Sequence, residues 1–273
     1  MTFAFSKEHP GQRRRRTTGL GPTRNPLYLL DGPAREVGIQ GPSLVLKVRG
    51  YPNPQRIPLD RIERIVCGVN TSWQGSALCT CFAKGIPITW INGKGRAEGM
   101  GLPTHDPDSP INDAILGYVN RMGWEKRYAN WLRSRRMNVL AHWTRSVGKD
   151  RRVNAQALEN LKREFVYHDR MEDFFIPDAQ GWCTSVATQL LLTEQIAPTY
   201  WGHGGRAMNL ANDLGHLYWA AFNLHCGSLA RQAPRGPEAL LLFEHWEQRH
   251  QGRILQHLGD LKKHIRVESA VCL

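Results

Sequence analysis

The stretch PTHDPDSPIND, residues 103–113, divides the sequence into two parts with different patterns. It holds three prolines and three aspartates, which is typical of a linker because both residue types favour turns over regular structure. Short apolar runs with strand periodicity precede it, and longer segments with helical periodicity follow it. The sequence therefore predicts an α+β protein, with an N-terminal β-rich domain followed by a larger all-α domain.

The β-rich domain is predicted over residues 25–102. Leu44 and Leu46 alternate with side chains that point the other way, which is the period of a half-buried strand. A helical pattern covers residues 76–84, and the apolar run at 85–91 is typical of a buried strand. We expect a small, mostly β domain with one helix.

The all-α domain is predicted over residues 114–273. Its segment YVNRMGWEKRYANWLRSRRMNVLAHW, residues 118–143, has aromatic and aliphatic side chains on one face and a dense basic face opposite. Tryptophans at helical spacing are more often core than stacking platforms, so we assign three of them to the core: Trp124, Trp131 and Trp143. Further helices are expected near residues 154–175, 182–195, 209–225 and 237–264.

The charge balance favours a polyanionic partner. Lysine and arginine total 36 against 24 acidic residues, for a formal net charge of +12. Arginine binds phosphates bidentately, and neutralised phosphates release counterions, so the composition favours nucleic acid as the partner. A basic protein without such a partner is the alternative. Residues 1–24 are polar and basic, with four consecutive arginines at 13–16, and are predicted to be a flexible arm.

Membrane insertion and secretion are not expected. No window of about 18 residues is uninterruptedly apolar, and the N-terminal residues lack the pattern of a secretory signal. The six cysteines form no CxxC pair and are typical of reduced thiols. We therefore expect a cytoplasmic protein.

Five arginines are candidates for DNA contacts. Four lie in the basic helical segment and one follows a glycine-rich turn: Arg127, Arg133, Arg135, Arg136 and Arg206. An arginine-rich face without a base-reading motif predicts contacts to phosphates rather than to bases. Solvated surface arginines are the alternative.

The stretch YWGHGGRAMNLANDLGH, residues 200–216, raises the possibility of a metal site. His203 stands among three glycines, and Asp213 follows ten residues later in a helical pattern, with His216 one turn further on the same face. Mg²⁺ and Mn²⁺ prefer oxygen ligands and tolerate an imidazole. The alternative is a surface turn followed by a core helix.

Three stretches together resemble the CRISPR-associated spacer-acquisition integrase family. The first is the β-rich domain, with its Leu27-Tyr28 start, the run IPLDRIERIV at 57–66 and the strand GIPITW at 85–90. The second is the proline-rich linker followed by the arginine-rich helix. The third is residues 197–214, where Gly202-His203 and LANDL look like the histidine loop and aspartate helix of the family.

The resemblance implies a β-domain that forms a homodimer and a helical catalytic domain with a metal site of one glutamate, one histidine and one aspartate. Carried over residue by residue, the ligands and catalytic residues are Glu159, His203 and Asp213. Glu164 and Glu172 are rivals for the position of the glutamate. His216 occupies a second position that is acidic in the family.

The resemblance also implies an activity: a metal-dependent DNA endonuclease and integrase of CRISPR adaptation, a system of antiviral defense. It would insert prespacer DNA into a repeat array by attack of a 3′-hydroxyl on a phosphodiester. Magnesium or manganese is the implied cofactor. The implied partners are double-stranded DNA, a second copy of the chain and a small ferredoxin-like CRISPR-associated subunit. Two alternatives stay open, a catalytically weakened relative that acts as a DNA-binding scaffold and a mobile-element integrase of the same fold.

Overall fold

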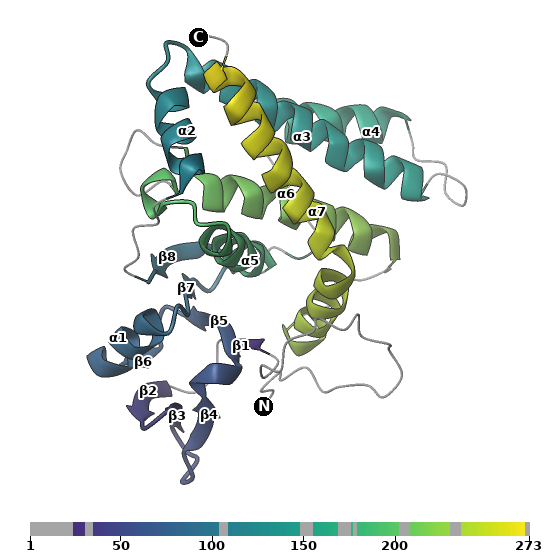
Figure 1. Ribbon diagram of the computed structural model, residues 1–273. Helices are drawn as coiled ribbons and strands as arrows, with labels where there is room; N and C mark the ends of the chain where they lie inside the picture. The colour runs from purple at the N-terminus through teal and green to yellow at the C-terminus, as the bar shows by residue number, and fades with distance from the viewer. Residues whose placement is uncertain are drawn as a thin grey trace. The chain divides into compact units, whose positions relative to one another are not determined.

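The computed structural model describes residues 24–30, 35–103, 109–147, 155–168, 176, 179–201, 208–229 and 236–270. The chain divides into two compact units, Met1–His105 and Asp106–Leu273. Strands dominate the first unit and helices the second, which confirms the predicted α+β class (Figure 1). None of the helices described is long and apolar enough to cross a membrane.

Two four-stranded sheets make up most of the first unit. One sheet has the order β1 (Asn25–Leu29), β5 (Ile62–Gly68), β7 (Ile88–Ile91) and β8 (Ala97–Gly101), and the other has β4 (Gln55–Pro58), β3 (Ser43–Val48), β2 (Arg35–Gln40) and β6 (Ser72–Trp73). A short 3₁₀ helix, Leu59–Arg61, leads into β5, and helix α1 (Gly75–Ala83) packs against β2. The strand β1 runs parallel to β5, and β5 runs parallel to β7.

The β2–β3 hairpin shows how the local sequence determines this unit. A two-residue turn joins the strands, and Gly41 in it has a φ of +57°, a value that residues with a Cβ rarely adopt. Leu44 and Leu46 are buried while Lys47 is exposed, so the predicted alternation is confirmed. The same two leucines belong to the core that β5 and α1 complete.

The second unit consists of helices. They are α2 (Pro110–Val119), α3 (Trp124–Val147), α4 (Ala155–Leu161), a π-helical turn η2 (Lys162–Tyr167), α5 (Ala179–Thr193), a 3₁₀ turn η3 (Pro198–Tyr200), α6 (Leu210–Leu229) and α7 (Gly236–Ala270). Residues 110–113, predicted to be linker, are the first turn of α2. The proline is compatible with this turn because the first N–H groups of a helix have no intrahelical partner.

Helix α6 is the centre of the second unit. It packs against α3, α5 and α7, and in Figure 1 the yellow α7 crosses it. The contact with α5 is close at Gly215, where a Cβ would lie 2.7 Å from the Thr184 hydroxyl oxygen and 2.8 Å from the Thr184 Cα. Trp131 of α3 is buried as predicted, whereas Trp124 and Trp143 are only partly buried.

Candidate functional site

Asp213 lies in the first turn of α6 and is held by a tyrosine of α3. The Tyr128 hydroxyl donates a hydrogen bond of 2.8 Å to Asp213 Oδ2, although the two residues are 85 positions apart. Tyr128 is buried and Asp213 is partly exposed. The tyrosine therefore orients one oxygen of a carboxylate that solvent still reaches.

Two features favour an ionised Asp213 as the acceptor and a neutral Tyr128 as the donor of this hydrogen bond. Burial, and then the charge of Asp213, raises the pKa of Tyr128 well above its ordinary value, so its hydroxyl keeps the proton it donates. The positive end of the α6 dipole favours a carboxylate in the first turn. The buried Arg136 acts electrostatically on Tyr128 in the opposite direction, which places a cation close to the pair.

The start of α6 is also where the chain returns from the glycine-rich stretch. Trp201 and Asn209 pair as an isolated antiparallel bridge, and the Asp213 N–H donates to the Asn209 carbonyl at 2.8 Å. The ends of the segment between them are therefore anchored beside the turn that carries Asp213. The predicted site residues His203 and Arg206 lie outside the described residues.

His216, one turn after Asp213, is engaged by helix α5. Its Nε2 lies 2.6 Å from Nε2 of the buried Gln180, and its ring is tilted against Trp219 with 5.8 Å between ring centroids. A hydrogen bond between two nitrogens needs one donor and one acceptor, so the Gln180 amide donates to the imidazole nitrogen. The imidazole nitrogen that accepts this bond is not available to a metal ion at the same time.

The candidate glutamates have a different environment. Glu159 is exposed on α4 and lies 3.4 Å from the Lys162 Nζ. Glu164 accepts a hydrogen bond of 3.1 Å from Arg163 Nε, and Glu172 lies outside the described residues. Helix α4 packs against η2, which in turn packs against α3, the helix of Tyr128.

No three histidine, cysteine, aspartate or glutamate side chains are grouped to hold a metal ion in the part of the chain that the structure describes. The predicted trio requires His203, which is not in that part. Asp213 by itself suits a hard divalent cation, because it is a partly exposed carboxylate oriented by a neutral donor. Among the described residues, Asp213 is therefore suited to be one ligand of such a metal site.

The predicted DNA-contacting arginines of α3 are not equivalent. Arg127 lies 3.2 Å from a Glu268 carboxylate oxygen, and Arg135 forms an ion pair with Asp260. Arg136 is buried, and its contact with DNA stays a prediction. Arg133 is exposed and donates to Asn130 at 2.9 Å.

Tyr128 is the residue of this candidate site that the sequence patterns missed. Its ring continues the aromatic face of α3, with 5.7 Å to the Trp131 ring centroid and 6.4 Å to that of Trp124. In the sequence it therefore looks like one more core aromatic. The signal that could have identified it is the hydroxyl, because a buried tyrosine usually needs a hydrogen-bond partner.

Comparisons with known proteins agree with this architecture. The family model described as CRISPR associated protein Cas1 matches residues 28–167, more than half of the chain. A search of curated proteins found no match. Among solved structures, TM1797, a CAS1 protein from Thermotoga maritima, is 14% identical with a TM-score of 0.60, and the match covers 87% of this chain and 96% of that one.

A second solved structure, TtCas1, is 14% identical with a TM-score of 0.57, and the match covers 88% of this chain and 98% of that one. At this identity the two structures establish a shared fold, and they extend it over both units. The match to the family model covers most of the β-rich unit and continues through α2, α3, α4 and η2. The chain therefore belongs to the CRISPR-associated Cas1 family.

Proposed function

We propose that the chain is a divalent-metal-dependent DNA integrase of CRISPR adaptation, which joins the 3′ ends of prespacer DNA into a repeat array. Membership of the Cas1 family supports the integrase role. The observation that carries the proposal is the position of Asp213. Its carboxylate lies in the first turn of the central helix α6 and accepts a hydrogen bond from the buried Tyr128 of α3. This is the kind of rigid support that a catalytic metal ligand needs.

Asp213, His203 and Glu159 are the residues that would hold Mg²⁺ or Mn²⁺. Such a metal, when bound, activates a 3′-hydroxyl as a nucleophile and stabilises charge on the attacked phosphate. Trp201, bridged to Asn209 beside Asp213, precedes His203 by two residues, and this supports a shared site for the two ligands. Tyr128 has the role of a positioning residue that fixes the Asp213 carboxylate.

The proposed partners follow from charge and family. Double-stranded DNA suits a chain with a formal net charge of +12, and Arg133 is exposed on α3, where a phosphate can reach it. A second copy of the chain and a small ferredoxin-like subunit are proposed from the resemblance, with action in the cytoplasm as part of antiviral defense. Light scattering of the full chain, alone and with the small subunit, checks both assemblies.

A DNA-binding scaffold is the second candidate function. The observation that favours it is the environment of Glu159, which is exposed and lies beside Lys162 rather than in a buried, supported position. A site with two ligands instead of three would bind the metal more weakly. The scaffold would keep the DNA affinity and lose the chemistry.

A strand-transfer assay on branched DNA separates these candidates. Phosphodiester exchange conserves the number of bonds, so a branched duplex that mimics the joined product can react in reverse and release a labelled strand without a known repeat sequence. We expect release in Mn²⁺ or Mg²⁺, none with a chelator, and none from Asp213→Asn. DNA binding without release in either metal would support the scaffold.

A further inference from the structure

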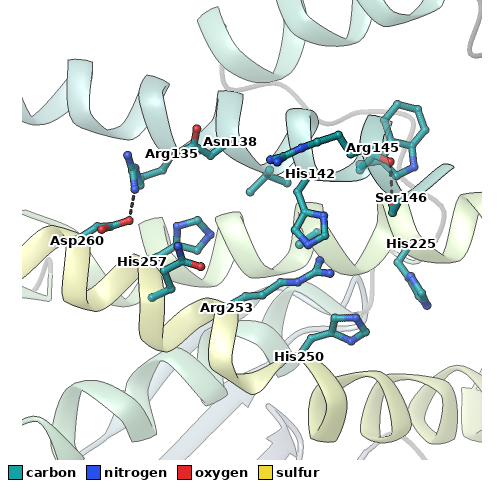
Figure 2. Close-up of a pocket in the computed structure, with 14 residues that line it drawn as sticks. Arg135, Asn138, His142, Arg145, Ser146, His225, His250, Arg253, His257 and Asp260 are labelled. Carbon is teal, nitrogen blue, oxygen red and sulfur yellow. Dashed lines mark hydrogen bonds and ion pairs between the residues drawn. The ribbon is translucent and has the colours of Figure 1, made fainter. Parts of the chain in front are cut away.

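A second polar site lies in the helical unit, away from Asp213. Helices α3, α6 and α7 enclose an open pocket of about 370 Å³ (Figure 2). His225 at its edge follows Asp213 by twelve residues on α6, which corresponds to about 18 Å at 1.5 Å per helical residue. His225 is therefore well separated from Asp213 along α6.

The lining of the pocket is strongly basic. Three arginines contribute to it, Arg135 and Arg145 from α3 and Arg253 from α7. Among the described residues that line it, Asp260 is the one carboxylate, and its ion pair is with Arg135. The charges of Arg145 and Arg253 therefore exceed what the carboxylate of the pocket can balance.

Four histidines line the same pocket from all three helices. They are His142 of α3, His225 of α6, and His250 and His257 of α7. In Figure 2 the His142 ring and the Arg253 guanidinium point toward the same space, and His225 and His250 lie beside each other with 5.3 Å between ring centroids. No metal-binding group of three side chains occurs among the described residues, so metal binding does not explain this cluster.

Three buried nitrogens at the pocket have no hydrogen-bond partner in the described part of the chain. They are Arg135 Nε, Trp143 Nε1 and His257 Nδ1. Arginine and indole nitrogens are donors only, and an imidazole nitrogen becomes a donor when it carries a proton. Buried donors without partners are costly, so the lining of the pocket holds more donors than the described residues satisfy.

We propose that this pocket binds a phosphate group of the DNA backbone and holds it away from the Asp213 site. Phosphate presents several acceptor oxygens, and arginine fits it bidentately. The pocket is larger than a phosphate group, so the attached sugar also fits. The assignment to DNA, rather than to a free phosphate, rests on the proposed integrase function.

Binding in this pocket is coupled to protons. Burial lowers the pKa of both His225 and His250. For His225, the neighbouring His250, Arg253 and Arg249 lower the pKa further. For His250, a hydrogen bond with the Trp246 carbonyl raises the pKa, whereas Arg253, His142 and Arg249 lower it. A phosphate would oppose those cations and raise both pKa values, so the histidines take up protons as it binds. Affinity therefore rises as pH falls toward the ordinary histidine pKa and weakens as pH rises above it.

His257 lines the same pocket but is expected to contribute less to the pH dependence of phosphate binding. Burial, and then Arg135, lowers the pKa of His257 to about 4, with Arg253 acting in the same direction and Asp260 in the other. It therefore stays neutral near pH 7 when no ligand is bound. We assign the proton coupling to the His225–His250 pair, whose ring centroids lie 5.3 Å apart.

Fluorescence anisotropy of a labelled duplex with the full chain tests the proposal. Arg253→Gln is expected to weaken DNA binding roughly tenfold and to lower the salt-dependence slope by about one, as for one lost phosphate contact. The matched control is Arg266→Gln, which removes the same charge from an exposed position of α7 outside the pocket. This control is expected to change affinity less than about twofold.

The pH arm uses His250→Gln. The wild-type chain is expected to bind the duplex more tightly at about pH 6 than at about pH 8, and His250→Gln is expected to reduce that difference. Equal effects of Arg253→Gln and Arg266→Gln, or a pH dependence that His250→Gln leaves unchanged, would overturn the proposal.

Inorganic phosphate distinguishes the source of the ligand. Histidine resonances of the wild-type chain, followed by NMR against pH, should shift with the duplex. If inorganic phosphate shifts the histidine resonances, and Arg253→Gln leaves the DNA affinity unchanged, the ligand is free phosphate and the assignment to DNA is overturned.

The strand-transfer assay separates this proposal from the proposed function. If the chain releases the labelled strand and Arg253→Gln does not change its DNA affinity, the phosphate site in the pocket is overturned and the integrase function stands. A strong effect of Arg253→Gln without strand release would overturn the integrase function and leave the pocket in place.

Discussion

Asp213 and Glu159 are proposed to bind the same metal ion, yet their environments in the fold differ. Asp213 is partly buried at the start of α6 and accepts a hydrogen bond from the buried Tyr128. Glu159 is exposed on the seven-residue helix α4 and lies beside Lys162. The Asp213 carboxylate is therefore already oriented in the absence of a metal, whereas the Glu159 carboxylate is not held by a buried partner.

The difference has an energetic consequence for metal binding. A ligand that is already oriented loses little side-chain entropy when it coordinates, whereas an exposed glutamate must be ordered and must leave its lysine. Surface ion pairs contribute little, so Lys162 is a weak competitor. The comparison predicts that Asp213 provides the fixed part of the site and that Glu159 completes it only when the metal and DNA are bound.

Asp213→Asn should have the largest effect. The substitution keeps the shape and removes the charge that would hold the metal, so metal-dependent strand release should fall about a thousandfold, equivalent to several kcal/mol of transition-state stabilisation. Duplex affinity measured by anisotropy should stay within about twofold, because a single partly exposed carboxylate contributes little to phosphate binding. Equal losses of affinity and of strand release would show that Asp213 supports the fold or the DNA rather than the chemistry.

Glu159→Gln tests the weaker member of the pair. If Glu159 completes the site, this variant should also abolish strand release, and a higher Mn²⁺ concentration should restore part of it because the remaining ligands still bind. Glu164→Gln is the matched control, since that glutamate lies in the adjoining π-helical turn and pairs with Arg163. Normal release by Glu159→Gln together with loss in Glu164→Gln would reassign the ligand.

Features that depend on local sequence could be predicted, as the strands and helices show. Local periodicity was sufficient for the alternation at Leu44 and Leu46, because strand burial repeats every two residues. It was also sufficient for α1, α3, α5, α6 and α7, whereas α2 begins inside the predicted linker and the helix predicted near 154–175 is α4 followed by the π-helical turn η2, with 169–175 outside the described residues. The order of strands and helices, together with the quoted motifs, was sufficient for the family.

Pairing over long distances was beyond those patterns. The bond between Tyr128 and Asp213 joins positions 85 apart, and no period in either helix encodes it. The burial of Arg136 likewise depends on how α3 packs in the folded chain, which a basic run in the sequence does not encode. A basic composition predicts a polyanionic partner and does not identify which arginines reach it.

Gly215→Ala tests whether the rigidity around Asp213 comes from helix packing. Its Cβ would lie 2.8 Å from the Thr184 Cα, a backbone atom that cannot move without shifting α5. We expect a loss of about 1–3 kcal/mol in the free energy of unfolding, measured with urea. Gly252→Ala is the control, because nothing lies within 4 Å of its Cβ on α7, and there alanine should be neutral or stabilise by up to about 1 kcal/mol. Equal stabilities of the two variants would mean that α5 and α6 are not tightly packed at this point.

Tyr128→Phe should have the smallest effect and is the most specific test of the comparison. Removing the hydroxyl deletes one hydrogen bond to Asp213 and leaves the ring stacked on Trp131, so stability should fall by only about 1 kcal/mol. Asp213 would then resemble Glu159, a carboxylate without fixed orientation. Strand release should fall roughly tenfold at low Mn²⁺ and recover as Mn²⁺ is raised, because the lost quantity is orientation rather than a ligand.

The pH profile adds a second readout for the tyrosine. Burial and the charge of Asp213 raise the pKa of Tyr128 well above its ordinary value, so the neutral hydroxyl should persist at alkaline pH. Strand release by the wild-type chain should therefore show no loss from tyrosine ionisation near the ordinary tyrosine pKa. A Tyr128→Phe defect that does not depend on the Mn²⁺ concentration, or one that matches the loss of stability alone, would place Tyr128 among the core aromatics and would mean that its hydroxyl does not orient Asp213 for metal binding.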